Sequence, residues 1–311
     1  MDPKLLYQFH YICELGSLSA AAKWLNISQP TLTRNLQTLE MTVGQSLVIR
    51  SRFGVSPTEI GIILSEQGAQ IVREVQRAEE VINTAKNQSL PMMRIGAGPV
   101  IAATFLNEFC AEELSRSQAI PFSTSVRNSR DLINDLIYNR LDIAIMATPP
   151  DSRVSGLGCQ FLSNENIALF AGSKSTLGRL GRLPSKGELE EARWVTMDVA
   201  LGPVTTFNSL IANLGIEPMR PVAQFGLDVT GIIHCLKTSD VLAFLPEQAS
   251  QKMMHPDDGI TKLDLNLGQA KRVISIWYRA NLEVDPILWS CYQRCLSFFQ
   301  KALDANEEPR S

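Results

Sequence analysis

The segment SQPTLTRNLQTLE, residues 28–40, restricts the fold of this chain more than any other segment. Three leucines are spaced i, i+4 and i+7, which places them on one helix face that must turn toward a core: Leu32, Leu36 and Leu39. Ser28 is the predicted N-cap, and Pro30 lies in the first turn, where its missing N–H group costs nothing. The other face is polar and has no acidic residue before Glu40. An ordinary solvated face, the alternative interpretation, usually carries Glu–Lys pairs.

Two more helices are predicted before this segment. KLLYQFHYICEL (4–15) has an apolar face at helical spacing and ends at Gly16, and SLSAAAKWL (17–25) forms a second, short helix. A turn at Asn26 and Ile27 joins the second helix to the third, which is the pattern of a helix-turn-helix. The third helix would then present its polar side to DNA, and the residues on that side are Pro30, Thr31, Thr33, Arg34 and Gln37.

SLVIRSRFGVSPTE (46–59) is predicted to form two short strands joined by a turn, which together make a wing. Arg50 and Arg52 are placed to reach phosphates or the minor groove. Residues 1–58 carry five basic and three acidic side chains, a net charge of +2, whereas the remainder of the chain carries −5. A polyanionic partner is therefore expected to meet the N-terminal part.

A single long helix is predicted over residues 59–89, beginning at a capping box from Ser56 or, equally well, at Thr58. Apolar or small residues recur along it with alternating spacings of four and three, which is a heptad seam: Leu64, Gly68, Ile71, Val75, Ala78, Ile82 and Ala85. A long helix with a narrow apolar stripe needs a partner, so dimerisation is predicted. Packing against the rest of the same chain is the alternative.

From residue 90 onward, short apolar runs alternate with amphipathic stretches. This rhythm predicts an α/β layer structure with mostly parallel strands, long enough for two lobes with a cleft between them. Strands are predicted at 93–98, 122–126, 142–147, 167–171, 194–197, 241–245 and 273–278, and helices at 99–114, 129–140, 204–214, 228–237 and 285–302.

Four loops that follow predicted strands carry small or polar residues. Ligands of open α/β sheets collect at the carboxyl ends of strands, so these loops are predicted to converge on one cleft, although each alone is read more simply as a capped turn. Gly96-Ala97-Gly98 lacks the third glycine of a dinucleotide fingerprint, so no cofactor is expected. What remains is a helix N-terminus suited to a carboxylate or phosphate. The loop residues are Gly98, Asn128, Ser129, Thr148, Pro149, Gly202, Pro203 and Thr205.

The sequence does not favour catalysis or a metal site. G-x-S-x-G, G-x-x-x-x-G-K-[ST] and H-E-x-x-H motifs are missing, and His234 and Cys235 are helix neighbours that point about 100° apart. Six cysteines form no C-x-x-C pair, so reduced thiols are expected. Asp2 stands where a secretory signal needs basic residues, and no run reaches the ~18 apolar residues of a membrane span. A cytoplasmic protein without a membrane partner is therefore expected.

Two stretches, GSLSAAAKWLNISQPTLTRNLQTLE and SLVIRSRFGVSPTEIG, closely resemble the N-terminal signature of LysR-type transcriptional regulators. NSRDLINDLIYNRLDIAI and DVTGIIHCLKTSDVLAFLP resemble segments of the effector domain of that family, so the resemblance covers essentially the whole chain. It implies a multi-domain α+β protein. The parts are a winged helix-turn-helix at 1–58, a dimerising linker helix at 59–89, and a two-lobed α/β effector domain like a periplasmic binding protein at 90–311, with lobe I about 90–163 and 269–302 and lobe II about 164–268.

The same resemblance implies sites and partners. DNA would be contacted by Ser28, Gln29, Pro30, Thr31, Thr33 and Arg34 at the major groove, and by Arg50 and Arg52 in the wing. A small effector would lie between the lobes near Gly98, Pro99, Val100, Asn128, Thr148, Gly202 and Thr205. The implied partners are double-stranded promoter DNA, the effector, a second copy through the linker helix with assembly to a homotetramer, and RNA polymerase as a further candidate.

Two departures from the family pattern bear on these expectations. Val48 replaces the usual phenylalanine of the wing and Phe53 stands where a basic residue is common, so Arg52 is expected to take over the minor-groove contact, or the wing to bind more weakly. Peroxide-sensing members carry a cysteine pair that residues 195–215 lack, so redox sensing by that route is not expected.

The sequence therefore predicts a sequence-specific DNA-binding transcriptional regulator that responds to a small molecule. Helix N-termini with Asn and Thr side chains favour an organic or aromatic acid as the effector. The alternative is a small-molecule-binding or enzymatic α/β protein whose N-terminal helices only mediate association. Measuring DNA binding at increasing salt concentration distinguishes the two hypotheses, because only a DNA-binding regulator has a DNA affinity that falls steeply as salt rises.

Overall fold

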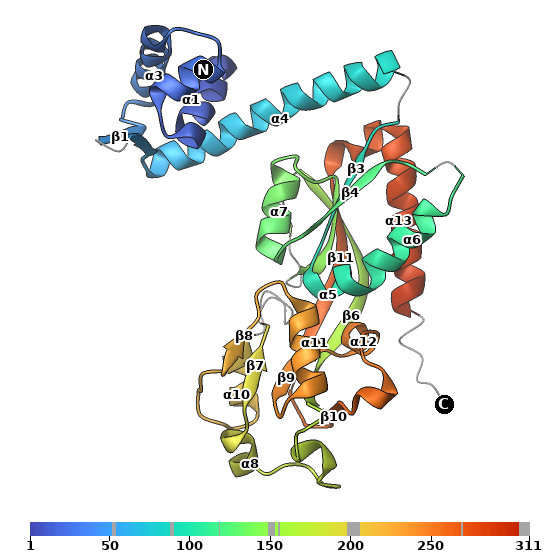
Figure 1. Cartoon of the computed structure of the whole chain (residues 1–311). Helices are drawn as coiled ribbons and strands as arrows, with labels where there is room; N and C mark the ends of the chain where they lie inside the picture. Colours follow the sequence, from blue (N-terminus) through green and yellow to red (C-terminus); the bar gives the residue numbers. More distant parts are fainter. Residues whose placement is uncertain are drawn as a thin grey trace. The chain divides into compact units, whose positions relative to one another are not determined.

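The computed structural model describes residues 1–51, 54–87, 90–117, 119–148, 153–154, 156–197, 206–268 and 270–304. The chain divides into two compact units, the first formed by residues 1–89 and the second by most of residues 90–311 (Figure 1). No helix within those described ranges is both long and apolar enough to cross a membrane.

The first unit consists of helices and a two-stranded antiparallel wing. Its elements are α1 (Pro3–Leu15), α2 (Leu18–Trp24), α3 (Gln29–Val43), β1 (Val48–Ser51), β2 (Gly54–Pro57) and α4 (Glu59–Asn87). The three leucines of α3 are buried as their spacing predicts, and they pack with apolar residues of α1 and α2: Leu32, Leu36, Leu39, Phe9, Ile12, Ala21 and Ala22. The predicted order of helices and wing is confirmed.

The start of α4 is fixed by Thr58. Its hydroxyl oxygen accepts a hydrogen bond from the Gly61 N–H group (3.2 Å), and its carbonyl oxygen accepts one from Ile62 (2.8 Å). Pro57 still belongs to β2, so the start at Thr58 is right and the capping box from Ser56 is wrong. Further along α4, Gly68 lies so close to the Leu6 carbonyl oxygen of α1 that a Cβ atom there would clash.

The second unit is built on one nine-stranded sheet with the strand order β4-β3-β5-β11-β6-β9-β7-β8, and β10 pairs with β6. The described strand pairs divide equally between parallel and antiparallel, so the expectation of mostly parallel strands is wrong. The reason is that β6 and β11 cross between the lobes and run antiparallel to every neighbour. The strands are β3 (Met93–Ala97), β4 (Phe122–Val126), β5 (Ile143–Thr148), β6 (Leu157–Ala171), β7 (Trp194–Thr196), β8 (Ala223–Gln224), β9 (Leu242–Pro246), β10 (Thr261–Leu263) and β11 (Lys271–Arg279).

Helices cover this sheet close to the predicted positions. The predicted helix at 99–114 is one continuous run whose middle is a π-helical turn. Two short helices, α8 and α12, have no counterpart in the sequence-based expectation. The helices are α5 (Pro99–Ile101), the π-turn η1 (Ala102–Leu106), α6 (Asn107–Leu114), α7 (Ser129–Ile137), α8 (Lys186–Glu191), α10 (Phe207–Asn213), α11 (Val229–Thr238), α12 (Glu247–Gln251) and α13 (Pro286–Asp304).

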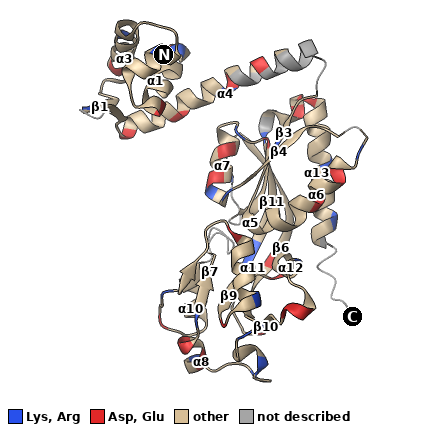
Figure 2. Ribbon diagram, viewed as in Figure 1, with Lys and Arg blue, Asp and Glu red and all other residues tan. Residues whose placement is uncertain are grey.

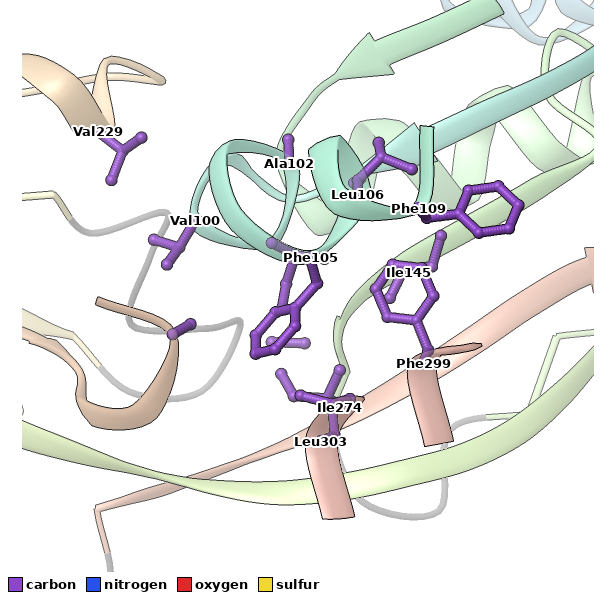
Figure 3. Close-up of a cluster of buried hydrophobic side chains, with 14 of the residues drawn as sticks. Val100, Ala102, Phe105, Leu106, Phe109, Ile145, Val229, Ile274, Phe299 and Leu303 are labelled. Carbon is purple, nitrogen blue, oxygen red and sulfur yellow. The ribbon is translucent and has the colours of Figure 1, made fainter. Parts of the chain in front are cut away.

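One apolar core runs through both lobes of the second unit. Phe105 of the π-turn packs among side chains of β5, β11 and α13, namely Ile145, Ile274, Phe299 and Leu303 (Figure 3). Val229 of α11 and Ala249 of α12 belong to the same buried cluster, so residues of lobe II contribute to it. The two lobes are therefore joined by packing as well as by the crossing strands.

Candidate DNA interface and effector site

The first turn of α3 presents a polar, exposed surface. Ser28 caps the helix by accepting a hydrogen bond from the Thr31 N–H group (3.3 Å), and the Ser28 and Thr31 hydroxyls hydrogen-bond to each other (2.7 Å). Gln29, Pro30 and Arg34 are exposed. Thr33 is half-buried at the edge of the same face. The structure therefore brings all six predicted contact residues together on the N-cap and the first two turns of α3.

Two polar residues of α3 turn away from this surface. The Asn35 amide donates to the Gln8 side-chain oxygen of α1 (2.7 Å), so it ties α3 to its own core. The Glu40 carboxylate accepts hydrogen bonds from the Leu47 N–H group (2.8 Å) and the Ser46 hydroxyl (3.0 Å). The single acid on α3 is thus used to fix the start of the wing, and the exposed first turn stays free of negative charge (Figure 2).

The wing carries Arg50 on an exposed position of β1, paired in register with Val55 of β2. Arg52 and Phe53 lie outside the described residues. The wing is held to the helical core because the Val55 N–H group donates to the Gly16 carbonyl oxygen at the end of α1 (2.8 Å). Gly54 adopts a φ of 127° at that contact, and a side chain there would meet the same oxygen.

The predicted seam on α4 divides into two parts. Leu64 and Gly68 face α1, so packing against the chain's own body accounts for the first turns. Farther along, Val75 and Ile82 are 45% and 51% exposed, and a shallow apolar groove of about 490 Å³ lies beside Val75 between α4 and Leu6 of α1. Packing against the chain's own body therefore describes the first turns of α4, and dimerisation through the later turns stays a prediction.

Three of the four predicted effector loops meet at one edge of the sheet in lobe I. The Gly98 N–H group donates to the Ile145 carbonyl oxygen (3.1 Å), and the Ser129 hydroxyl donates to that of Ala147 (2.7 Å). Thr148 ends β5 at the same edge, because β3, β4 and β5 are mutually parallel around β3. Gly98, Ser129 and Thr148, predicted from separate loops, are thus brought together.

Several of these polar groups already have partners inside the protein. Asn128 caps α7, because its side-chain oxygen accepts from the Asp131 N–H group (2.9 Å) and its amide donates to the Asp131 carboxylate (2.8 Å). Pro99 and Val100 are buried, and the Val100 side chain belongs to the core. What this helix start offers a ligand is the backbone, since the first N–H groups of a helix have no partner within it.

The lobe II side of the predicted site is described only in part. Pro149, Gly202, Pro203 and Thr205 lie outside the described residues. Met197, the residue after β7, is buried in the same core cluster as Val100 of α5. Thr206 then caps α10 by accepting from the Ser209 N–H group (3.2 Å).

The predicted effector loops do not include the N-terminus of α11 (Val229–Thr238), although this helix itself is predicted at 228–237. Asp228 caps this helix, accepting from the Gly231 N–H group (2.8 Å) and the Thr230 hydroxyl (2.7 Å), and these hydrogen bonds lower the pKa of its carboxyl group. The next residue, Val229, shares the core cluster with Val100 (Figure 3). The sequence signal was Asp228 at the first position of the predicted helix 228–237. An Asp there indicates a helix cap but does not show which loops lie nearby.

An ion pair that joins the two lobes was also not predicted from the sequence. The Lys252 ammonium group, at the end of α12, contacts both carboxylate oxygens of Glu108 in α6 (2.8 and 2.9 Å) and lies 4.5 Å from the centre of the Phe105 ring. At the start of α12, the Ala249 N–H group donates to the buried Glu165 carboxylate of β6 (2.7 Å). Arg272 of β11 pairs with that same carboxylate (2.6 Å), so α12 is fixed to both crossing strands.

The chemistry of the remaining reactive groups does not suggest catalysis. The six cysteines are free thiols, and burial raises the pKa of Cys13 and Cys291 to about 11, which keeps both protonated and weakly reactive. Among the residues that the structure describes, no group of three His, Cys, Asp or Glu side chains is arranged to hold a metal ion.

Comparison with known proteins gives two adjacent family matches. Residues 3–62 match the family described as bacterial regulatory helix-turn-helix protein, lysR family, and residues 87–300 match the LysR substrate binding domain. The chain is 30% identical over 190 residues, 61% of its length, to the nitrogen assimilation regulatory protein nac of Klebsiella aerogenes, and the match spans 61% of that protein's length.

Solved structures match over nearly the whole chain. ArgP from Mycobacterium tuberculosis has a TM-score of 0.68 at 15% identity, and the match covers 96% of this chain and 97% of that one. Full-length CbnR complexed with its target DNA has a TM-score of 0.59 at 20% identity, with 98% and 100% covered. At such identities the likeness shows a shared fold.

Proposed function

The chain belongs to the LysR family of DNA-binding transcriptional regulators, and from this premise we propose that its α3 surface reads an operator while the second unit responds to a small acid. The observation that carries the proposal is the acid-free first turn of α3, where Gln29, Pro30 and Arg34 are exposed side by side. Amide, guanidinium and apolar groups of this kind match the base edges of the major groove.

Arg34→Ala is expected to weaken operator binding by about tenfold or more, because it removes the one cationic side chain of that surface. Gel shifts with double-stranded fragments selected from a randomised pool by the purified chain would measure the change at two salt concentrations. Arg182→Ala, which removes an exposed arginine paired with Glu188 in the second unit, is the matched control and should leave DNA affinity unchanged. Unchanged binding by the Arg34 variant would show that α3 is not the reading helix.

The proposed assembly is a dimer formed through α4, with dimers pairing into a tetramer. Val75 and Ile82, seven residues apart on one stripe and half-exposed, support it because apolar side chains of that spacing stabilise a coiled coil only when a second helix covers them. Each α3 carries a single arginine, so one reading unit would make few phosphate contacts. Several copies in one assembly would supply the missing affinity.

The proposed effector is a small organic or aromatic acid held between the lobes. Support comes from the start of the helical run 99–114, where the Val100 and Ile101 N–H groups face no helical partner and attract an anion. No predicted cleft residue that the structure describes is a lysine or arginine, so an acid there would depend on backbone N–H groups and on Ser and Thr hydroxyls.

A panel of small carboxylic acids is expected to contain members that raise the melting temperature of the full chain, since a ligand at a hundred times its dissociation constant adds about 2.7 kcal/mol of stability. Differential scanning fluorimetry would measure the shift. The primary amide of each acid is the matched control, because it keeps the shape and removes the charge. If the amides stabilise the chain as well as the acids do, the anionic character of the effector is refuted.

A further inference from the structure

We infer that Ser19 of α2 is a positioning residue for base recognition, which holds the Gln29 side-chain amide with its NH₂ group turned outward from the protein. The Ser19 hydroxyl donates a hydrogen bond to Gln29 Oε1 at 3.0 Å, across the turn that joins α2 to α3. The inference rests on the proposed contact between Gln29 and DNA, and it adds which chemical group that contact presents.

The hydroxyl of Ser19 has a different task from those of the neighbouring serines. Ser17 caps α2 by accepting from the Ala20 N–H group (3.3 Å), and Ser28 caps α3. Ser19 lies one residue inside α2, where no cap is needed, and its side chain is exposed rather than packed in the core. Its hydrogen bond reaches ten residues along the chain to the first residue of α3. The bond therefore serves to orient the Gln29 side chain more than to form either helix.

Fixing the amide oxygen decides which atom faces DNA. The terminal torsion of a glutamine side chain is broad, so an unrestrained amide can turn either its oxygen or its nitrogen outward. With Oε1 held by Ser19, Nε2 on the same carbon points away from Ser19. The outward group is then a double donor, which matches guanine, because guanine presents two acceptors, O6 and N7, in the major groove.

The usual glutamine contact with adenine requires both atoms of the side-chain amide to face the base. It uses Nε2 as the donor to N7 and Oε1 as the acceptor from N6, with both atoms facing one base. Since Oε1 is turned toward Ser19, that two-point contact is disfavoured. The structure assigns guanine over adenine at the base that Gln29 contacts, and it makes Ser19 the residue that sets this preference.

The experiment compares base preferences of the full chain and its variants in a pool of double-stranded oligonucleotides with a randomised centre. The variants are Ser19→Ala, Ser19→Thr, Gln29→Ala and, as a matched control, Thr42→Ala, whose hydroxyl bonds only to a carbonyl of its own helix near the far end of α3. Gln29→Ala is expected to flatten the preference at one position. Ser19→Ala is expected to shift the guanine-to-adenine ratio at that same position toward adenine by about threefold to tenfold, the factor that one net hydrogen bond supplies.

Ser19→Thr retains the hydroxyl and should restore the guanine preference, and Thr42→Ala should leave every position unchanged. If Gln29→Ala flattens no position, the proposed contact of Gln29 with DNA fails. If it does flatten one, while Ser19→Ala leaves the ratio there unchanged or weakens binding equally for every sequence, the contact stands and the positioning role of Ser19 is overturned.

Discussion

Asp142→Asn is expected to lower the free energy of unfolding by about 3–5 kcal/mol, the cost of leaving a buried cation without its carboxylate. Asp142 precedes β5 and is 1% exposed. One of its oxygens accepts from the Arg279 side chain at the end of β11 (2.7 Å), and Arg94 of β3 makes a two-point contact with both oxygens (3.1 Å each). The Arg94 backbone N–H group donates to the same carboxylate (2.8 Å).

This one carboxylate therefore joins β3 and β11 to the start of β5, and Arg279 is as buried as its partner. Asparagine keeps the shape but removes the charge and one acceptor, so a guanidinium is left buried without neutralisation. Urea denaturation followed by circular dichroism would measure the loss. Asp264→Asn is the matched control, because that carboxylate is 77% exposed and pairs with Lys262 at the surface, where such pairs contribute about 1 kcal/mol or less. Equal midpoints for both variants would show that Asp142 does not hold the strands together.

The double substitution Val75→Glu and Ile82→Glu is expected to separate the proposed dimer and to weaken operator binding by about 10²–10⁴-fold, the loss that follows when linked reading units become independent. Both side chains lie half-exposed on the described part of α4 and do not belong to the core of the first unit. Charges placed there should leave each chain folded while they repel a second copy of the same seam.

Size-exclusion chromatography with light scattering would give the mass of the assembly, and gel shifts would give the affinity. Ile62→Glu is the matched control, since Ile62 is similarly exposed on α4 but lies off the seam. A variant that keeps the mass and affinity of the unchanged chain would place the dimer contact elsewhere.

Local patterns predicted the first unit almost completely. Helical spacing of leucines, serine caps and glycine stops act within a few residues, so α1, α2, α3 and the wing follow from sequence. Where two local signals competed, at Ser56 and Thr58, only the structure chose, because the choice depends on whether Pro57 pairs in β2.

The alternation of strands and helices in the second unit was predicted from the sequence. The direction in which its strands pair was predicted less well. The first half of β6 was not foreseen, because Cys159 and Phe161 are exposed and that stretch lacks a buried apolar run. The short helices α8 and α12 were missed because six and five residues give too little periodicity to detect. The antiparallel pairing of β6 and β11 is a property of strands that cross between lobes, and no local pattern records it.

For the candidate sites, the sequence determined which residue types lie on which helix face and at which strand end, because side-chain direction follows from the backbone period. Tertiary structure alone decided which of those groups are already engaged. It turned Glu40 to the wing, joined Ser19 to Gln29 and placed Lys252 against Glu108. These partners are distant or cross a turn, and only folding brings them within the short range of a hydrogen bond.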